Sequence, residues 1–482
     1  MDPKSATGSL HVTHDEVLTF AKATGDASPL HVDVSYARCT PFGEPVAHGL
    51  LCLLKVLAEA PPLTGRTLAA LQARFVGPVL PGQSYVWEVE TAAPEGEDGA
   101  VSLSIRLVDG RRTLIEGEAD FVRGELRAAP SKAARPKAAT ESAVTKFEEL
   151  AVGAVHGGAY RPDWQALRSL GAELRLPDRG VGVEHLAVLG WSSHLAGMEA
   201  PGRAAMISGY EMTCGDSGGR KGFTGRAEIT DIDERFRTVR LAGEVLVGRL
   251  EAHVRLRTVA RREAVPPSAD VLRSLLAEVV TGRQLSGRSA FVTGGSRGLG
   301  AALVQALAIA GCTVHAAFHH SRAEAESLVA ALGRDGSRVR LHQGDVADER
   351  WCAETRKVIE AECGPVDLLF LNAGPAAQVW DLHTAAVPRA VDHVRRGVQL
   401  AQAPLAAFAD GLAARGGRVV AISSAYVTVP HRGLSHYIAA KHAVEGLVRA
   451  SAAEYPGTGV SIVRPPRLAT TFADSVASAH DA

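Results

Sequence analysis

The pattern of apolar and polar positions predicts one long helix and several strands in a first segment, residues 1–126. Apolar residues at helical spacing predict a helix over Asp15–Ala23, and beyond a polar loop an apolar stretch predicts a longer one over His48–Ala58. The predicted strands are Leu10–Thr13, Leu68–Val76, Ser84–Thr91, Val101–Val108 and Thr113–Val122. A long helix followed by consecutive strands is typical of an α+β domain whose antiparallel sheet wraps around that helix.

Residues 286–482 alternate short apolar strands with helices, which predicts an α/β domain with a doubly wound parallel sheet. The predicted strands are Ala290–Thr293, Thr313–Ala317, Val339–His342, Val366–Leu371, Arg418–Ser423 and Val460–Val463. The predicted helices are Gly300–Ala310, Ala323–Leu332, Arg350–Glu362 and Tyr437–Glu454. Two Pro-containing stretches, Arg127–Lys146 and Ala260–Pro267, are expected to be linkers, and a helix is expected over Val271–Val280.

Composition narrows the function classes. The 482 residues are 46% hydrophobic and 22% charged, and 52 basic against 53 acidic residues argue against a strongly basic nucleic-acid-binding domain. The six cysteines form no C-x-x-C pair, the first ten residues do not resemble a signal peptide, and no apolar run reaches about 18 residues. We therefore expect a reduced, soluble, cytoplasmic protein with no metal, membrane or nucleic-acid partner.

A carboxylate and an imidazole lie close together in the polar loop of the first segment. Asp26 and His31 are separated by Pro29, and His48-Gly49 follows at the start of the apolar helix. Elimination of water beside a carbonyl needs one group to remove a proton and another to protonate the leaving hydroxyl or hold the water. Backbone N–H groups at a helix start can stabilise the developing enolate oxygen. The alternative is that Asp26 caps a turn and His31 is a surface histidine.

The motif G-D-x-x-P-L-H-x-D followed by P-V-A-H-G resembles the MaoC-like, R-specific enoyl-thioester hydratases and dehydratases of the hotdog fold, from Leu10 to Val122. The resemblance implies that Asp26 and His31 form the catalytic dyad and that Gly49 is an oxyanion donor. Ser28 stands where the family usually has asparagine, and its shorter side chain predicts weaker positioning of water. Asp33 is expected to be structural, at a helix N-terminus.

Residues 147–258 are expected to form a second, degenerate hotdog. Phe147–Gly153 resembles the opening phrase of a hydratase repeat, Val181–Met198 is a candidate wrapped helix, and Ala204–Leu256 a candidate set of strands. No G-D-x-x-P-x-H motif occurs there, and His185 and His194 lack a partnered carboxylate in a matching loop. The two segments would form a double hotdog, in which the second half completes the sheet and the acyl tunnel without catalysis.

The third segment carries a glycine-rich turn and a Tyr-x-x-x-Lys pair. The turn, Thr293–Gly300, follows a strand and opens a helix, which suits a pyrophosphate. Tyr437 and Lys441 lie one turn apart on one helix face, so the ammonium is expected to lower the pKa of the phenol. The phenol can then give a proton to a carbonyl oxygen that Ser424 holds while hydride reaches the carbon.

Together these motifs resemble the short-chain dehydrogenase/reductases, a Rossmann fold, from Gly287 to Pro466. The resemblance implies catalytic roles for Ser424, Tyr437 and Lys441. It implies dinucleotide binding by Gly294, Ser296, Arg297, Gly298, Gly300, Ser321, Arg322, Asp345, Asn372 and Gly374.

NADPH is the expected cofactor. Phe318–Arg322 holds no carboxylate to bind a ribose 2′-hydroxyl, whereas Arg297 and Arg322 could contact a 2′-phosphate. The alternative is that both arginines are solvated surface charges. The adjacent His319 and His320 are not expected to ligate a metal.

Three departures bear on the reductase. Val394 stands where the family has a proton-relay asparagine, Pro465-Pro466 replaces the usual P-G, and sixteen residues remain for a substrate-covering lid.

The sequence predicts a ketoreductase–dehydratase of fatty-acid or polyketide assembly that uses acyl carrier protein or coenzyme A thioesters, with a possible homodimer. A dehydratase with a pseudo-reductase domain, a non-catalytic scaffold, and the reverse reaction direction remain open.

Overall fold

A computed structural model of the chain describes residues 4–38, 40, 42–91, 100–124, 126, 146–218, 222–262, 267–279, 284–466 and 468. The chain divides into two compact units, formed mainly by residues 1–263 and 264–477, and each is treated by itself. The predicted linker Arg127–Lys146 lies outside the described residues except for Lys146, as does the central part of Ala260–Pro267. The sixteen residues after Pro466, which were expected to be too few for a lid, also lie outside the described residues except for residue 468.

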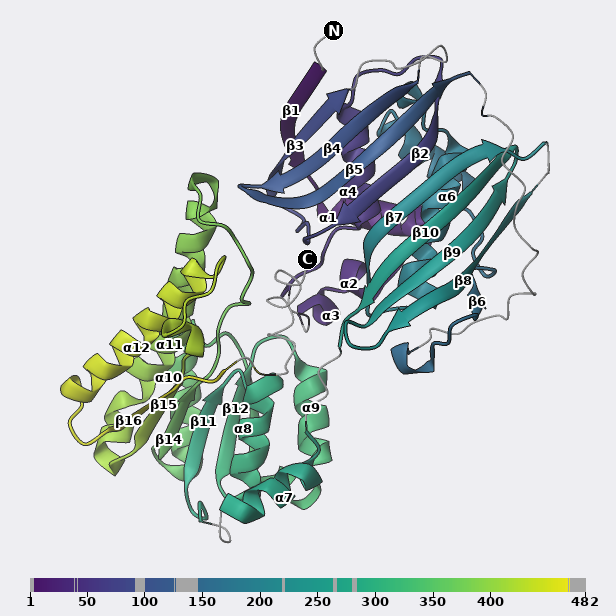
Figure 1. Cartoon of the computed structure of the whole chain (residues 1–482). Helices are drawn as coiled ribbons and strands as arrows, with labels where there is room; N and C mark the ends of the chain where they lie inside the picture. Colours follow the sequence, from purple (N-terminus) through teal and green to yellow (C-terminus); the bar gives the residue numbers. More distant parts are fainter. Residues whose placement is uncertain are drawn as a thin grey trace. The chain divides into compact units, whose positions relative to one another are not determined.

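The first unit contains a ten-stranded antiparallel sheet in the order β1-β3-β4-β5-β2-β7-β10-β9-β8-β6 (Figure 1). Its first half comprises β1 (Lys4–His11), β2 (Arg66–Phe75), β3 (Ser84–Thr91), β4 (Val101–Asp109) and β5 (Arg112–Arg123). Its second half comprises β6 (Val155–His156), β7 (Ala205–Asp216), β8 (Phe223–Asp233), β9 (Thr238–Val247) and β10 (Leu250–Ala260). Each strand of the second half occupies the place of the strand numbered five lower, and the halves join where β2 pairs with β7.

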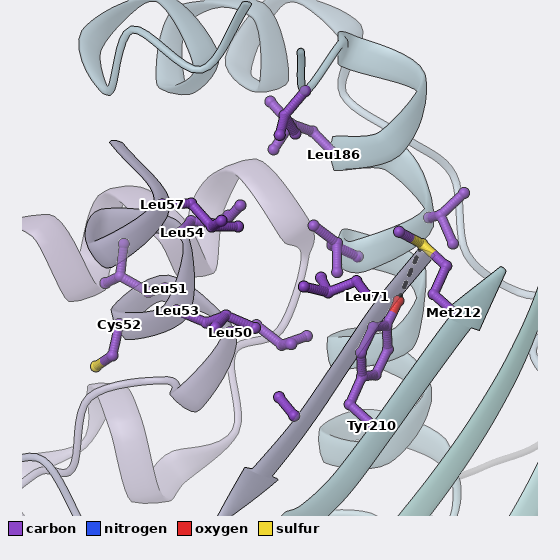
Figure 2. Close-up of a cluster of buried hydrophobic side chains, with 14 of the residues drawn as sticks. Leu50, Leu51, Cys52, Leu53, Leu54, Leu57, Leu71, Leu186, Tyr210 and Met212 are labelled. Atoms are coloured by element: carbon purple, nitrogen blue, oxygen red, sulfur yellow. Dashed lines mark hydrogen bonds between the residues drawn. The ribbon is translucent and has the colours of Figure 1, made fainter. Parts of the chain in front are cut away.

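Each half contributes a buried helix to one shared core. Helix α4 (Gly49–Glu59) is apolar on nearly every face, as expected for a helix buried all round, and α6 (Val183–His194) is almost wholly buried as well. In Figure 2, Leu50, Leu54 and Leu57 of α4 lie in the same cluster as Leu186 of α6 and Met212 of β7. This packing explains why the two halves form one unit.

Short helices hold the loop that leads to α4. Helix α1 (His14–Thr24) begins with a capping box between Thr13 and Glu16 and ends at Gly25, whose φ of 67° is the left-handed conformation that glycine adopts readily. The region expected to be a polar loop contains α2 (Pro29–Val32) and α3 (Val34–Arg38). Asp33 caps α3 by accepting hydrogen bonds from two backbone N–H groups.

Other elements of the first unit also differ from the sequence prediction. Strand β1 covers Lys4–His11, not Leu10–Thr13, because it pairs along its whole length with β3 at the edge of the sheet. Thr13 is instead the cap of α1. Helix α5 (Trp164–Glu173), which Asp163 caps, was not predicted.

The second unit is the predicted doubly wound parallel sheet, in the order β13-β12-β11-β14-β15-β16. The strands are β11 (Ser289–Thr293), β12 (Thr313–Phe318), β13 (Val339–Gln343), β14 (Leu368–Leu371), β15 (Arg418–Ile422) and β16 (Gly459–Val463). Strand order reverses beside β11, where β12 and β14 flank it. Ligands of such sheets bind beyond the carboxyl ends of the strands at this switch point.

Helices pack in two layers on this sheet (Figure 1). One layer is α7 (Ala269–Val279), α8 (Gly298–Ile309) and α9 (Arg322–Ala331), and the other is α10 (Glu349–Cys363), α11 (Val387–Arg415) and α12 (Ser435–Glu454). The sequence did not predict α11, whose interior contains Pro404. Among the described residues, no helix is both long enough and apolar enough to cross a membrane.

Candidate active sites

Asp26, His31 and His48 lie together at the start of α4 in the first unit. One ring nitrogen from each histidine and one carboxylate oxygen of Asp26 all lie within 4.8 Å of one another. The rings of His31 and His48 stack with centroids 3.8 Å apart, and His48 Nε2 is 3.1 Å from the backbone oxygen of Asp26. The structure thus brings together the two residues of the expected dyad, and adds His48.

The tautomer of His31 follows from one hydrogen bond. Its Nδ1 is 2.6 Å from the backbone oxygen of Val46, which can only accept, so Nδ1 carries the proton. Burial lowers the pKa of His31, although the charge of Asp26 and the bond to Val46 oppose the shift. The imidazole is therefore neutral at pH 7, with a lone pair on Nε2 that can accept a proton.

The second half of the unit holds the carboxylate of Asp26. Ser193 of α6 donates a hydrogen bond of 2.6 Å to Asp26 Oδ2, and the backbone N–H of Ser28 donates one of 3.2 Å to Oδ1. A Cβ atom on Gly197, in the π-helical turn Leu195–Glu199, would lie only 2.2 Å from Oδ1. Ser193 and Gly197 thus shape this site, although they lie 167 and 171 positions after Asp26 in the sequence.

Ser193 and Gly197 were not predicted from the sequence. Two adjacent serines, Ser192 and Ser193, directly follow the apolar run 186–191 of this helix, and that buried polar pair was the available signal. His194 also holds the loop, because its Nδ1 is 2.9 Å from the backbone oxygen of Gly25. His194 Nε2 also lies 3.7 Å from a carboxylate oxygen of Glu199. Glu199 is not in a loop equivalent to the one that contains Asp26.

Gly49 is the first residue of α4, where the N–H groups of the first turn have no acceptor within the helix. A Cβ atom there would lie 2.6 Å from the ring of Phe75. Only glycine therefore fits, and its N–H can face an oxygen anion beside His48.

In the second unit, Ser424, Tyr437 and Lys441 meet at the carboxyl end of β15. The side chains of Ser424 and Tyr437 are hydrogen-bonded, and Lys441 Nζ lies 5.7 Å from the centre of the Tyr437 ring. Lys441 donates a hydrogen bond of 2.8 Å to the backbone oxygen of Ile422. Hydrogen bonds from Arg464, and further ones from Ser423 and Arg449, hold the pKa of the buried Glu445 at about 2 and anchor α12.

The expected lowering of the Tyr437 pKa by Lys441 is wrong. Burial raises that pKa, and the hydrogen bond with Ser424 only partly opposes the shift. Burial also lowers the pKa of Lys441 to about 8. The sequence showed the helical spacing of the two side chains but not the low polarity of their surroundings, which favours both uncharged forms.

The glycine-rich turn between β11 and α8 is tightly packed and requires glycine. Gly294 and Gly298 have φ values of 66° and 53°, and a Cβ atom on Gly300 would lie 2.0 Å from the backbone oxygen of Gly294. Asn372, after β14, donates hydrogen bonds of 3.1 Å from Nδ2 to the backbone oxygens of Thr293 and Gly294. The Asn372 side chain therefore connects the end of β14 to the glycine-rich turn after β11, at the point where the strand order reverses.

Comparisons with known proteins match one stretch of the chain in each unit to a family. Residues 288–481 match the short chain dehydrogenase family, and residues 2–102 match the MaoC like domain. The chain is 33% identical over 178 residues to acetoacetyl-CoA reductase of Rhizobium meliloti, covering 36% of this chain and 70% of that one.

A second relative is the 3-oxoacyl-[acyl-carrier-protein] reductase FabG of Vibrio harveyi. It is 30% identical over 191 residues, with 37% of this chain and 71% of that one covered. The chain is also 38% identical to glycine betaine reductase ATRR of Emericella nidulans over 192 residues, 39% of this chain but only 15% of that protein.

The chain belongs to the short-chain dehydrogenases. It carries a MaoC-like domain on the same polypeptide, so the predicted fusion of these two families is confirmed.

In the short-chain dehydrogenase unit, Arg322 at the start of α9 is engaged with neighbours. It donates hydrogen bonds of 3.1 and 2.5 Å to Gln343 Oε1, and lies 3.3 Å from Glu326. Its side chain is 60% exposed, so the guanidinium can still meet a ligand. Ser321 precedes it, at the cap position of α9, and Arg297 holds the cap position of α8.

Asp345, after β13, forms a two-oxygen ion pair with Arg396 of α11, with both distances 2.8 Å. Burial alone would raise the pKa of Asp345, but hydrogen bonds from Ala347 and Arg396 hold it below its usual range. Arg396 was not identified from the sequence. Gly374 lies near Lys441, since a Cβ atom there would be 3.7 Å from Lys441 Nζ.

Proposed function

We propose that the chain reduces a 3-ketoacyl thioester with NADPH to the 3R-hydroxyacyl thioester and then eliminates water to give the trans-2-enoyl product. The observation that carries the proposal is the presence of both sites on one chain, because the product of the first reaction is the substrate of the second. Relatives named as reductases of acetoacetyl-CoA and of 3-oxoacyl-acyl carrier protein support the thioester class. Fatty-acid or polyketide assembly is the setting in which these reactions are consecutive.

For the elimination, we assign the removal of the C2 proton to Nε2 of His31, which carries a lone pair. Asp26 acts in its protonated form and delivers that proton to the departing hydroxyl, so that one water molecule leaves. The proton that His31 has taken up then returns to Asp26 through solvent. The N–H of Gly49 stabilises the negative charge that develops on the thioester oxygen. The reverse reaction, hydration, uses the same groups with their protons exchanged.

We further propose that the first unit is a double hotdog. Support comes from the identical strand order of the two halves and from their equivalent helices, α4 and α6. The second half is non-catalytic in this proposal, and its contribution to the reaction is to position Asp26 through Ser193.

For the reduction, the glycine-rich turn fits a dinucleotide because Gly294 and Gly298 allow its left-handed backbone conformations and it leads into the start of α8, where backbone N–H groups can meet a pyrophosphate. Gly294, Ser296, Arg297, Asp345 and Asn372 would hold or support the cofactor, which supplies hydride. Ser424 orients the carbonyl oxygen, and Tyr437 gives that oxygen a proton. Burial keeps the phenol protonated for this step.

One pair of assays tests the proposed function. Purified protein should oxidise NADPH in the presence of acetoacetyl-CoA and should hydrate crotonyl-CoA. Hydration without any NADPH oxidation, with coenzyme A and carrier-protein thioesters alike, would favour the second candidate, a dehydratase with a pseudo-reductase domain. Val394 in place of the relay asparagine is the observation that keeps this candidate open.

The preference for NADPH rests on Arg297 and Arg322 and has its own test. We expect calorimetry to show tighter binding of NADPH than of NADH, and Arg322→Glu to remove the difference, because a carboxylate repels the 2′-phosphate. Arg340→Glu, at an exposed arginine of β13, is the matched control and should keep the preference. Equal affinity for both cofactors in the unmodified protein would contradict the assignment.

The carrier, the homodimer and the cytoplasmic location are proposals of the same kind. Acyl carrier protein and coenzyme A present the same phosphopantetheine thioester, and comparing the rates with the two carriers would distinguish them.

A further inference from the structure

Arg261, which directly follows β10, lies beside the loop that carries Asp26 and His31. Its side chain is half-buried, and its guanidinium donates a hydrogen bond of 3.1 Å to the hydroxyl of Tyr36. Among the described residues, Arg261 forms no ion pair with a carboxylate, and its Nε is buried without a partner. Keeping a positive charge partly buried and unpaired is costly, which points to an anion that binds there.

Tyr36 of α3 connects Arg261 to a second arginine. Both guanidinium groups lie over the ring of Tyr36, at 5.0 Å from its centre for Arg203 and 5.7 Å for Arg261. Arg203 is exposed, and its backbone oxygen accepts hydrogen bonds from the hydroxyls of Tyr36 at 3.5 Å and of Ser28 at 3.4 Å. Two planar guanidinium groups around one aromatic ring are suited to a phosphate, which they can contact with paired N–H groups.

Hydrogen bonds connect this pair of arginines to the reaction centre. The backbone N–H of Ser28 donates to Asp26 Oδ1, and the hydroxyl of Ser28 donates to Arg203. Burial is the main cause of the lowered pKa of His31, and the positive charge of Arg261 adds to the shift. Asp26 is only 3% exposed, whereas His31 is partly exposed. The arginines therefore lie on the side of the site from which a substrate can enter.

We propose that Arg261 and Arg203 bind the phosphate that joins the pantetheine arm of the substrate to its carrier. The inference rests on the proposed dehydratase function and assigns the anionic part of its thioester substrate to a site. Acyl carrier protein and coenzyme A both attach a phosphate to the end of the pantetheine arm that is distant from the thioester. That arm must leave the buried Asp26 on the partly exposed side, and its phosphate supplies the acidic partner that Arg261 lacks among the described residues.

The test measures hydration by the full chain of crotonyl-CoA and of two thioesters that differ in this phosphate, crotonyl-phosphopantetheine and crotonyl-pantetheine. Arg261→Gln should raise the KM for crotonyl-phosphopantetheine and crotonyl-CoA about tenfold, as expected for one lost charge-assisted contact, with kcat and the KM for crotonyl-pantetheine unchanged. Arg261→Lys keeps the charge and should lose less. Arg203→Gln should act in the same direction but more weakly, because Arg203 is more exposed. Arg255→Gln, at an exposed arginine of β10 paired with Glu211, is the matched control and should keep every value.

Each other outcome overturns the proposal. An unchanged KM for crotonyl-phosphopantetheine in Arg261→Gln would show that this arginine binds no phosphate of the substrate. An equal rise for crotonyl-pantetheine would show that Arg261 supports the loop and not a phosphate. A rise with crotonyl-CoA alone would assign the arginines to the nucleotide part of coenzyme A, which a carrier protein lacks. If the unmodified protein hydrates none of the three thioesters, the proposed dehydratase is refuted together with this inference, which a defect confined to the variants would not do.

Discussion

The cluster around Asp26 and the cluster around Tyr437 differ in what burial does to the side chain that handles the proton. In the first, burial lowers the pKa of His31 and leaves an imidazole that can accept a proton. In the second, burial raises the pKa of Tyr437 and leaves a phenol that can donate one. Burial favours the uncharged form in both. Before reaction, each side chain is thus in the protonation state that reduction followed by dehydration requires.

The two sites also differ in how far along the chain their parts come from. Tyr437 and Lys441 share one helix, and Ser424 lies thirteen residues before the tyrosine. Asp26, in contrast, is held by Ser193 of helix α6, from the other half of the unit. The first arrangement depends on local geometry, whereas the second depends on the assembly of the whole unit.

Removing the phenol hydroxyl should have the largest effect and should separate the two sites. We expect Tyr437→Phe to abolish NADPH oxidation, a loss of at least about 10²-fold, because Tyr437 is the group that we assign to protonate the carbonyl oxygen. NADPH binding and the hydration of crotonyl-CoA should be unchanged. Equal NADPH oxidation by the variant and the unmodified protein would identify the domain as a pseudo-reductase.

Asp26→Asn should have the complementary effect. The amide keeps the size of the carboxylate but cannot exchange a proton, so hydration of crotonyl-CoA should fall roughly 10²–10⁴-fold. The thermal unfolding midpoint and NADPH oxidation should stay close to those of the unmodified protein. Hydration at the original rate would remove Asp26 from the proposed mechanism.

Ser193→Ala tests whether the second half takes part in the chemistry. Loss of the hydrogen bond to Asp26 Oδ2 should lower hydration about tenfold, since such bonds to a carboxylate contribute about 1.5–3 kcal/mol. Ser192→Ala is the matched control, because Ser192 bonds to the backbone oxygen of Val188 and not to Asp26. If the two variants lose activity equally, the effect belongs to the helix and not to the site.

The smallest expected effect is a difference in pH dependence. NADPH oxidation should decline as the pH rises through about 8, where Lys441 loses its proton. Dehydration should stay level over the same range, because the pKa of His31 lies below 6.5 and its imidazole is already neutral. Lys441→Arg keeps the positive charge at high pH and should remove the decline, if the charge is what matters. Parallel pH profiles for both reactions would contradict the comparison.

Local patterns predicted much of the fold and of both sites. The glycine-rich turn, the spacing of Tyr437 and Lys441, and the loop with Asp26 and His31 each lie within a short stretch, where periodicity and turn chemistry suffice. Helix α11 was not predicted, in part because Pro404 interrupts a pattern that tertiary packing nevertheless holds in one helix.

Contacts between distant residues could not be predicted in the same way. Nothing in the sequence pairs Ser193 with Asp26, or Arg396 with Asp345, because these contacts exist only once separate helices have packed. The direction of the Tyr437 pKa was wrong for a related reason. Helical spacing indicates which groups are neighbours, but the polarity of the medium between them depends on the surrounding fold.

The pairing of β2 with β7, from Ala70 opposite Thr213 to Arg74 opposite Gly209, has an evolutionary consequence. If the two halves were identical subunits, any substitution would appear in both at once. Because the two halves are joined in one polypeptide, each half can accumulate its own substitutions. The pairing of β2 with β7 keeps the halves together at any protein concentration. One half can then lose its reactive loop and be selected for a supporting contact, such as the hydroxyl of Ser193 against Asp26. Fusion of two similar halves in one chain thus allows them to take different roles.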